Sequence, residues 1–377
     1  MTTVFVLNAG SSSIKYTVLD LDAGAKGGGV LADGIVDRIG VPGSGVPDHA
    51  AALTTVLGEI DGTAIDAVGH RVVHGGERFT DATVIDDDVE AAIQELIELA
   101  PLHNPAGLAG IRAARTALPD VPHVAVFDTA FHATMPPEAA TYAIDAALAE
   151  RHGIRRYGFH GTSYQYVSRV AAELLGRPLA ELRMIVLHLG NGASAAAIRG
   201  GRSIDTSMGL TPLEGLVMGT RSGDLDPAIL FRLHRVAGLS VDELDDLLNR
   251  RSGMLGLSGH ADMREVCDAA EAGDPAATLA LEVYLHRIRH YIGAYAAVLG
   301  ELDALVFTAG VGENSDVVRA GAVRGLEFLG ITVDPDANAI RSDTPRSISP
   351  AGSPVAVLVV PTDEELEIAE QTARLVG

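Results

Sequence analysis

A pattern of strand, polar turn and strand occurs twice in this chain, about half a chain apart. Residues 4–7 form an apolar run of strand length, a Ser-rich turn follows at 8–13, and residues 14–19 are largely apolar again. Residues 184–189 and 193–198 repeat this order around the turn at 190–192. The pattern predicts two related halves, each with a hairpin whose turn has the size and polarity to hold a phosphate group.

The rest of the chain alternates strand-like and helix-like segments. Strands are predicted at 67–73, 123–127, 304–308 and 354–360. Helices are predicted at 87–99, 105–117, 163–175, 241–249, 276–299 and 363–375, because apolar residues recur there at i, i+3 or i+4. Segments 22–45 and 334–353 are predicted to be surface loops or edge elements. The alternation predicts an α/β fold.

Length and charge restrict the classes of partner. A chain of 377 residues predicts two or three domains. With 28 Lys and Arg against 50 Asp and Glu, the net charge of -22 would repel a phosphate backbone, so we expect no nucleic-acid partner. No apolar run approaches the ~18 residues of a membrane span, so no membrane partner is expected. The single cysteine, Cys267, and the lack of a signal-peptide pattern predict a cytoplasmic protein.

Three glycine-containing turns follow predicted strands and suit a nucleotide. The turn at 8–15 offers backbone N–H groups, three hydroxyls and the ammonium of Lys15, without the Gly-Lys-Ser/Thr order of a Walker A loop. The other two turns are at 188–192 and 308–314, and the last of them opens a helix whose N-terminus favours anions. For the first turn, an ordinary hairpin with a surface lysine is the alternative.

Several charged side chains are candidates for an oxyanion site. Arg71 and Arg221 lie in glycine-flanked motifs, and a guanidinium binds carboxylate or phosphate with two parallel hydrogen bonds. A structural salt bridge is the alternative for either arginine. His160 could donate to a phosphoryl group in transfer. Asp128 and the acidic run 363–365 end predicted strands, where α/β enzymes hold metals and substrates, although Asp363 could instead cap the last helix.

Seven segments, in order along the chain, resemble the motifs of the acetate kinase family: 8–15, 70–77, 157–163, 188–192, 207–227, 307–315 and 361–366. The resemblance implies an α/β protein of two duplicated ribonuclease H-like domains, with the active site in the cleft between the domains, and a homodimer. The domains implied are 1–149, and 150–361 for nucleotide binding and dimerisation, with the last helix, 362–377, returning to the first domain.

The resemblance also assigns roles to single residues. It implies Mg²⁺, or Mn²⁺, held by Asn8 and Glu364, and a phosphate-proximal turn with Ser11, Ser13 and Lys15. The implied catalytic residues are Arg71, Asp128, His160 and Arg221. Arg71 would also bind the substrate, beside an apolar pocket of Val73, Leu102, Phe159 and Pro212. Besides Lys15, the implied binding segments for ATP and ADP are His188, Leu189, Gly190, Asn191 and Gly192; Asp262, Met263 and Arg264; and Gly310, Val311, Gly312, Glu313 and Asn314.

The activity implied is reversible, direct in-line phosphoryl transfer from ATP to acetate, which gives acetyl phosphate and ADP. Because acetate is already ionised at pH 7, with carboxyl pKa values near ~4, no general base is needed. Propionate kinase, a sugar or glycerol kinase of the same fold, and a non-catalytic nucleotide switch are the alternatives. The chain departs from the family pattern at Tyr164, at Asp363 and in the loop 259–262, which is one residue shorter.

Overall fold

The computed structural model describes residues 2–10, 12–23, 29–60, 62–101 and 103–377, and it divides into two compact units. Unit 1 comprises Met1–Ala133, Phe159–Ser163 and Asp363–Gly377, and unit 2 comprises Thr134–Gly158 and Tyr164–Thr362. The resemblance described above implies a division after residue 149. The segment after Ala133 lies with unit 2, because Thr134 Oγ1 donates to Ser203 O at 2.8 Å and the helix at Pro137–Ala140 packs against the strand at Arg202–Thr206.

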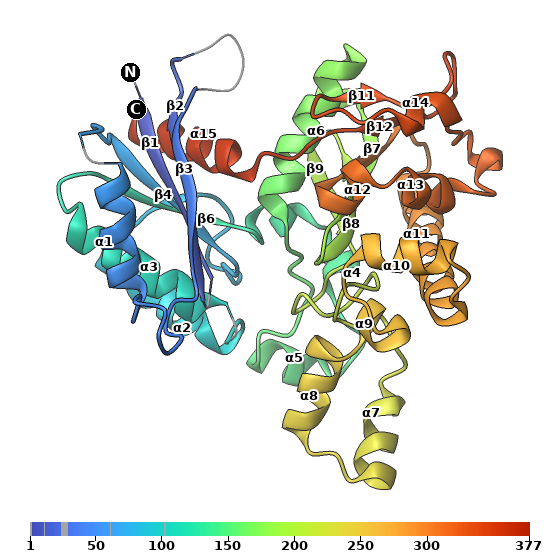
Figure 1. Ribbon diagram of the computed structural model, residues 1–377, viewed down its shortest axis with the longest axis horizontal. Helices are drawn as coiled ribbons and strands as arrows, with labels where there is room; N and C mark the ends of the chain where they lie inside the picture. The colour runs from blue at the N-terminus through green and yellow to red at the C-terminus, as the bar shows by residue number, and fades with distance from the viewer. Residues whose placement is uncertain (1, 11, 24–28, 61, 102) are drawn as a thin grey trace. The chain divides into compact units, whose positions relative to one another are not determined.

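Unit 1 is built on a mixed sheet with the strand order β3-β2-β1-β4-β6-β5 (Figure 1). Its strands are β1 (Thr3–Ala9), β2 (Ser13–Asp20), β3 (Gly29–Asp37), β4 (Ala67–Val72), β5 (Thr83–Val84) and β6 (His123–Phe127). Its helices are α1 (His49–Glu59), α2 (Asp87–Glu95), α3 (Asn104–Ala117) and α15 (Glu364–Val376). The strands β1, β4 and β6 are parallel to one another, so their carboxyl ends share one edge of the sheet.

The alternation of side chains along β1 explains how this sheet is covered on both faces. Phe5 and Leu7 pack in a cluster with residues of α1 and α3, whereas Val4 and Val6 pack in another cluster with Ile368 of α15. A central strand buried on both faces has a nearly continuous apolar sequence, as this one has. The packing holds the first turn of α15 near the strands that carry the candidate site residues.

Unit 2 repeats this topology with the strand order β9-β8-β7-β10-β12-β11. Its strands are β7 (Arg183–Leu189), β8 (Ala193–Arg199), β9 (Arg202–Thr206), β10 (Ala304–Thr308), β11 (Arg346–Ser347) and β12 (Ala356–Val359). In both sheets an antiparallel run of the first three strands is followed by two parallel strands and one antiparallel edge strand. The predicted duplication of an α/β, ribonuclease H-like domain is therefore confirmed.

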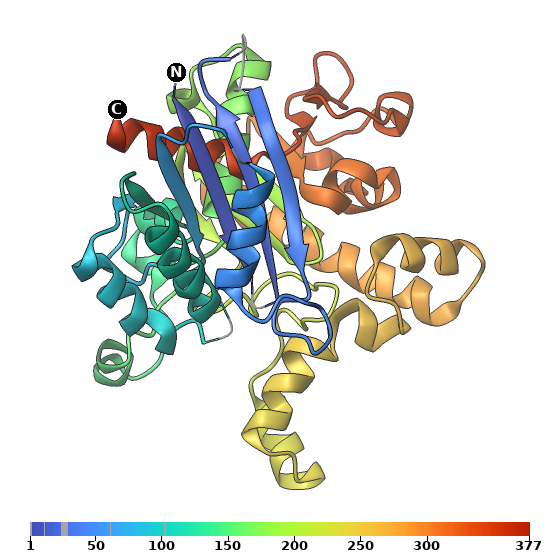
Figure 2. The same ribbon diagram turned by 60° about the vertical axis from the view of Figure 1, so that its left-hand side comes forward.

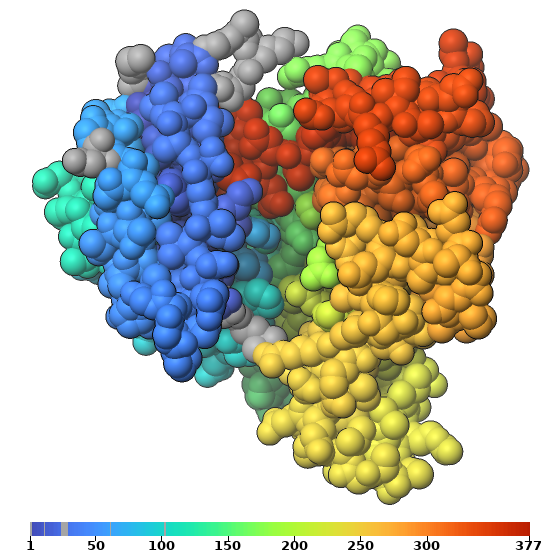
Figure 3. Space-filling model, in the orientation of Figure 1, coloured from blue at the N-terminus to red at the C-terminus, as the bar shows by residue number. Residues whose placement is uncertain are grey.

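The helices of unit 2 surround its sheet and extend one arm from it. They are α4 (Pro137–Ala140), α5 (Ala146–Arg151), α6 (Gly161–Leu175, whose first turn lies in unit 1), α7 (Ala228–Arg232), α8 (Val241–Arg250), α9 (Gly253–Ser258), α10 (Met263–Glu271), α11 (Pro275–Leu299), α12 (Ala309–Asn314), α13 (Asp316–Val323) and α14 (Pro335–Ala339). Helix α11 packs on β7 and β8 and buries Ile288 and Ile292. Helices α7 and α8 form the yellow arm in Figure 2, and its surface is the yellow lobe in Figure 3.

The strong sequence patterns correspond to observed elements. Both predicted hairpins are present as β1 with β2 and β7 with β8, and the predicted strands 123–127 and 304–308 match β6 and β10. Segment 22–45, predicted as loop or edge element, contains the edge strand β3, and its residues 24–28 lie outside the described part. The elements that were not predicted are the strands β5 and β9 and the helices α1, α4, α5, α7, α9, α10, α13 and α14.

No helix within the described part of the chain combines the length and the apolar character that a membrane crossing requires.

Candidate active site

Arg71 and Asp128 form an ion pair at the carboxyl ends of two neighbouring strands of unit 1. Arg71 lies on β4, and Asp128 directly follows β6. Arg71 Nε donates to Asp128 Oδ1 at 2.9 Å and Nη2 donates to Oδ2 at 2.7 Å. The Asp128 carboxyl is buried, and the Arg71 side chain is 21% exposed. The paired donors fix the plane of the guanidinium relative to the sheet.

The ionisation of this pair follows from burial and from mutual attraction. Burial by itself lowers the pKa of Arg71, but the charges of Asp128 and Glu364 and the hydrogen bonds to Asp128 raise it overall above its ordinary value. Burial raises the pKa of the Asp128 carboxyl, and the charge and hydrogen bonds of Arg71 oppose that rise. Arg71 is therefore held as a cation, oriented by Asp128.

Glu364 approaches the same guanidinium from the first turn of α15. Its Oε2 lies 3.9 Å from Arg71 Nη2 and accepts a hydrogen bond of 2.9 Å from Thr162 Oγ1. Asp363 caps α15, because its Oδ1 accepts from Leu366 N at 2.9 Å. The capping role considered for Asp363 is thus confirmed, and Thr162 is a partner of Glu364 that the sequence analysis did not single out, although Thr162 lies in the motif at 157–163.

The loop that carries His160 is fixed against the backbone of Asp128. Gly161 N donates to Asp128 O at 2.9 Å, and a Cβ atom at Gly161 would overlap that oxygen. His160 adopts φ of 59°, in the left-handed region that non-glycine residues rarely occupy. Phe159 is buried with its ring 5.5 Å from that of His74, and its carbonyl lies 2.9 Å from His132 Nε2. Strain held by neighbouring contacts is typical of functional loops.

The first turn places Asn8 and Lys15 opposite each other on β1 and β2. Lys15 Nζ lies 2.5 Å from Glu365 Oε1, and its side chain is 55% exposed. Ser13 begins β2, and its carbonyl accepts from Gly10 N at 2.7 Å. The predicted residues Ser11 and Leu102 lie outside the described part of the chain.

In unit 2 the turn at 188–192 packs against the loop that leads to Arg221. Asn191 O accepts from Gly219 N at 3.0 Å, and a Cβ atom at Gly219 would overlap Asn191 Oδ1 and lie 3.1 Å from Ala261 O. Glycine at position 219 allows this approach without displacing the Asn191 side chain. The turn at 188–192, the Arg221 loop and the segment before Asp262 are thereby brought together.

The third predicted turn, 308–314, is the helix α12 with Thr308 as its N-cap residue, and it lies beside the turn at 188–192 because β10 and β7 are parallel neighbours. Ala309 has φ of 63°, and a Cβ atom at Gly190 would lie 3.9 Å from Ala309 Cβ. Glu313 Oε1 accepts from Thr362 N at 3.1 Å, and burial raises the pKa of its carboxyl. The predicted ATP-binding segments 188–192 and 310–314 therefore share one edge of the unit 2 sheet.

The third predicted nucleotide segment is the start of α10. Asp262 caps the helix by accepting from Arg264 N at 2.8 Å, and the hydrogen bond from the Arg264 side chain lowers the pKa of Asp262 to about 2. The Met263 side chain is buried, whereas the Arg264 side chain is 88% exposed. Met263 can therefore offer a ligand only its backbone.

Arg221 differs from Arg71 in having no acidic partner among the residues that the structure describes. Its Nη1 donates to Pro212 O at 3.3 Å and lies 3.7 Å from Met218 Sδ. The Arg221 side chain is half-buried, and this burial lowers the pKa of its guanidinium. A partly desolvated cation without a carboxylate is suited to an anionic ligand.

The predicted site residues are thus held in two groups. Unit 1 holds Asn8, Lys15, Arg71, Val73, Asp128, Phe159, His160 and Glu364, and unit 2 holds Pro212, Arg221 and the three nucleotide segments. Within the described ranges, no cluster of three or more His, Cys, Asp or Glu side chains could hold a metal ion by itself.

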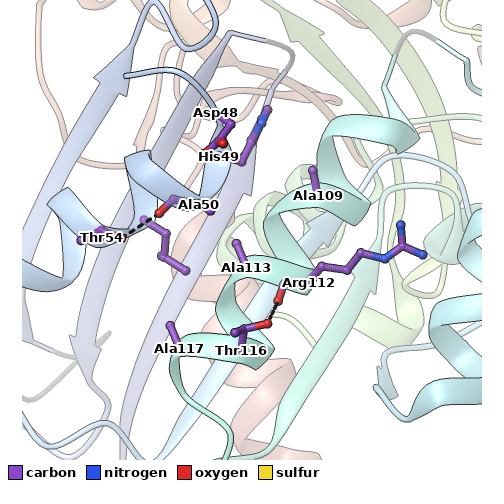
Figure 4. Close-up of a pocket in the computed structure, with 10 residues that line it drawn as sticks. Asp48, His49, Ala50, Thr54, Ala109, Arg112, Ala113, Thr116 and Ala117 are labelled. Atoms are coloured by element: carbon purple, nitrogen blue, oxygen red, sulfur yellow. Dashed lines mark hydrogen bonds between the residues drawn. The ribbon is translucent and has the colours of Figure 1, made fainter. Parts of the chain in front are cut away.

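A groove on unit 1 lies apart from these residues. It has a volume of about 490 Å³ and runs between facing sides of α1 and α3, with His49, Thr54, Ala109, Arg112 and Thr116 on its walls (Figure 4). None of the predicted site residues lines it.

Solved structures resemble this chain over its whole length. The crystal structure of Porphyromonas gingivalis acetate kinase superposes with a TM-score of 0.94, with 44% sequence identity and 100% of each chain covered. A propionate kinase from Francisella tularensis superposes with a TM-score of 0.92 and 40% identity, covering 99% of this chain and 100% of the other. The chain therefore has the duplicated α/β architecture of these kinases.

The sequence profile of the acetokinase family matches residues 3–370, and this chain belongs to that family. A curated relative, the acetate kinase of Leifsonia xyli subsp. xyli, is 61% identical over 399 aligned residues, which cover 100% of both chains.

Proposed function

We propose that this protein is an acetate kinase, which reversibly transfers the γ-phosphoryl group of ATP to acetate and produces acetyl phosphate and ADP. One feature of Arg71 most directly supports a small carboxylate such as acetate as the phosphoryl acceptor. Nε and Nη2 are engaged by Asp128, while no described residue accepts a hydrogen bond from Nη1. The edge formed by Nη1 and Nη2 is left to bind a second, small carboxylate with two hydrogen bonds.

The chemistry needs orientation and charge neutralisation more than proton transfer. Acetate is ionised at neutral pH, because carboxyl pKa values lie near ~4. An acetate oxygen attacks the γ-phosphorus, the bond from that phosphorus to the β,γ-bridging oxygen breaks, and ADP leaves with the electron pair. Asp128 acts in this scheme by orienting Arg71 and not by removing a proton.

Arg221 and His160 are proposed to stabilise the phosphoryl group during transfer. The desolvation of Arg221 and its lack of a described acidic partner support this role, since a preorganised donor is most effective where water is excluded. The loops at 188–192, 262–264 and 310–314 are proposed to bind the nucleotide, with Lys15 near its terminal phosphates.

Asn8 and Glu364 are proposed to hold Mg²⁺, or Mn²⁺. Amide and carboxylate oxygens are the donors these ions prefer, and Mg²⁺ is commonly bound by one or two protein groups together with phosphates and water. When bound, the ion supplies positive charge to the β- and γ-phosphates. Thr162 supports the assignment, because its hydroxyl orients Glu364 Oε2.

We also propose that the protein is a cytoplasmic homodimer, with unit 2 supplying both the nucleotide site and the interface. ATP is an intracellular substrate, which supports the location. Exposed apolar side chains of unit 2 support an interface, among them Phe231, Val236, Val241 and Leu279.

The test is an assay of acyl phosphate trapped as hydroxamate by hydroxylamine, with ATP, Mg²⁺ and purified protein. Acetate and propionate are compared as acceptors, glycerol is compared by release of ADP because glycerol phosphate forms no hydroxamate, and EDTA is the metal control. We expect a strong signal with acetate, a weaker one with propionate and none with glycerol or EDTA. One methylene changes binding in an apolar pocket by only ~1–3 kcal/mol, so the ratio of acetate to propionate measures the selectivity of the pocket. ATP hydrolysis without acyl phosphate would instead indicate a nucleotide-dependent switch.

A further inference from the structure

Arg156 is an arginine of unit 2 that no step of the proposed chemistry uses, yet its contacts are unusually numerous. Its side chain is 16% exposed. Nη1 donates to three successive backbone carbonyls, those of Thr206 at 2.9 Å, Ser207 at 3.3 Å and Met208 at 3.1 Å. Nη2 donates to Glu214 Oε1 at 2.7 Å. One guanidinium thus binds both ends of the loop 206–214.

Glu214 and Tyr142 complete the enclosure of this loop. Glu214 Oε2 accepts a hydrogen bond from the Tyr142 hydroxyl, and that hydroxyl accepts one from Leu210 N at 3.2 Å. The guanidinium carbon of Arg156 lies 5.5 Å from the centre of the Tyr142 ring. A Cβ atom at Gly209 would overlap both Glu214 Oε2 and the Tyr142 hydroxyl. Glycine at position 209 lets the loop close around these three side chains.

The loop held in this way carries proposed site residues. Pro212 belongs to it, and Pro212 O accepts the 3.3 Å hydrogen bond from Arg221 Nη1. The next residue after Glu214, Gly215, donates to Asp224 Oδ1 at 2.8 Å, which ties the loop to the segment that follows Arg221. A displacement of the loop would therefore move Pro212 and the oxygen that contacts Arg221.

The segment that contains Arg156 also leads directly to the strained histidine loop. Tyr157 N and Gly158 N donate to Gly209 O at 3.1 and 3.3 Å. Phe159 and His160 follow at once in the sequence. Residues 156–158 therefore contact the loop 206–214 through their backbone and through the Arg156 side chain.

We propose that Arg156, together with Glu214 and Tyr142, is a positioning residue that sets the place of Pro212 and Arg221 and thereby the acyl-chain selectivity of the enzyme. The inference rests on the proposed function. Arg156 does not touch substrate and acts through the loop. A lysine could keep the charge at position 156 but could not reach three carbonyls and a carboxylate with one planar group.

The experiment compares Arg156→Lys and Tyr142→Phe with the wild type and with the control Arg289→Lys. Arg289 lies on α11 and donates to Gly321 O at 2.7 Å, outside the loop. For Arg156→Lys we expect a loss of at least ~10-fold in kcat/KM for acetate, because small displacements of positioning groups are costly. The acetate-to-propionate ratio of kcat/KM should change at least ~3-fold, with KM for ATP nearly unchanged. Tyr142→Phe should shift the acetate-to-propionate ratio in the same direction but by less. We expect Tyr142→Phe to fold even if Arg156→Lys does not.

Two outcomes would overturn the inference. The first is a lowered melting temperature in both variants with the wild-type selectivity ratio, since that result describes a purely structural arginine. The second concerns amide hydrogen exchange in the loop 206–214. We expect this exchange to become faster in Arg156→Lys but not in Arg289→Lys. Unchanged exchange in Arg156→Lys contradicts the inference even if the wild type forms no acyl phosphate. Failure of the proposed function is recognised separately, by the absence of acyl phosphate in the wild type.

Discussion

The two carboxylate oxygens of Asp128 each accept one hydrogen bond from Arg71, at 2.9 Å from Nε and 2.7 Å from Nη2. This bidentate pair uses both acceptor oxygens of a buried carboxyl group to orient a cation. In the proposed mechanism Asp128 therefore supports the acceptor site through Arg71, whereas the alternative role for an aspartate at the end of a strand is that of a general base. The two readings make different predictions.

Asp128→Asn should lower kcat/KM for acetate by at least ~100-fold, because the amide lacks the charge and one of the acceptor oxygens that orient Arg71. The pH dependence of the residual activity between pH 6 and 9 should match that of the wild type. Steady-state kinetics of acyl phosphate formation measure both quantities. A residual rate that rises in proportion to hydroxide concentration would favour the base.

Arg71→Ala and Arg221→Ala should each lower kcat/KM by at least ~100-fold, a size typical of losing one preorganised donor to developing charge. Arg112→Ala is the matched control, because Arg112 pairs with Glu90 on the surface of unit 1, away from the candidate site. Near-wild-type kinetics for either site variant would remove that arginine from the proposed mechanism.

Thr162→Val should raise the Mg²⁺ concentration that gives the half-maximal rate. Valine keeps the shape of the buried threonine but removes the 2.9 Å hydrogen bond to Glu364 Oε2. Loss of such an outer partner typically costs ~10–100-fold in metal affinity or activity. The measurement is the Mg²⁺ concentration for half-maximal rate, with Thr116→Val, on the exposed side of α3, as the control. An unchanged Mg²⁺ dependence would argue against Glu364 as a metal ligand.

Two buried histidines, on β4 and β6, predict a loss of stability in mild acid. His70 Nε2 lies 3.0 Å from His123 Nδ1, and His123 Nε2 lies 3.0 Å from Leu118 O, so a neutral pair satisfies every one of these contacts. Burial lowers the pKa of His70 well below its ordinary value and also lowers that of His123. The unfolded chain therefore binds more protons as the pH falls below ~6.5, and the folded state loses about 1.4 kcal/mol per histidine per pH unit until the folded-state pKa is reached.

Urea unfolding at pH 7.5 and 5.5 measures this effect. The double variant His70→Gln with His123→Gln should show a flatter dependence of the unfolding free energy on pH than the wild type. The exposed His286→Gln should leave the wild-type dependence unchanged. Equal slopes in the wild type and the double variant would contradict the assignment.

Local sequence patterns predicted the elements whose determinants are local. The apolar strands of both hairpins and the i, i+3 or i+4 spacing in α11 are examples. Arg71 was recognised because it lies in a glycine-flanked motif, and Asp128 because it ends a strand of clear pattern. β3 was recognisable only as an edge element, since an edge strand with alternating exposure lacks a continuous apolar run. The short β9 was not predicted at all.

The contacts that give the candidate site its geometry were beyond sequence reasoning. Thr162 and Glu364 are 202 residues apart, and nothing local links them. The left-handed backbone of His160 is held by neighbours and not by its own preference. Arg156 binds mainly backbone carbonyls, which carry no residue identity that a pattern could reveal.

The most direct test of the account follows phosphorus in one reaction that contains the protein, ATP, Mg²⁺ and acetate, by ³¹P NMR. If the protein is an acetate kinase, ADP and acetyl phosphate appear together in equal amounts, and both require acetate. Inorganic phosphate in place of acetyl phosphate, or ADP formed at the same rate without acetate, would contradict it.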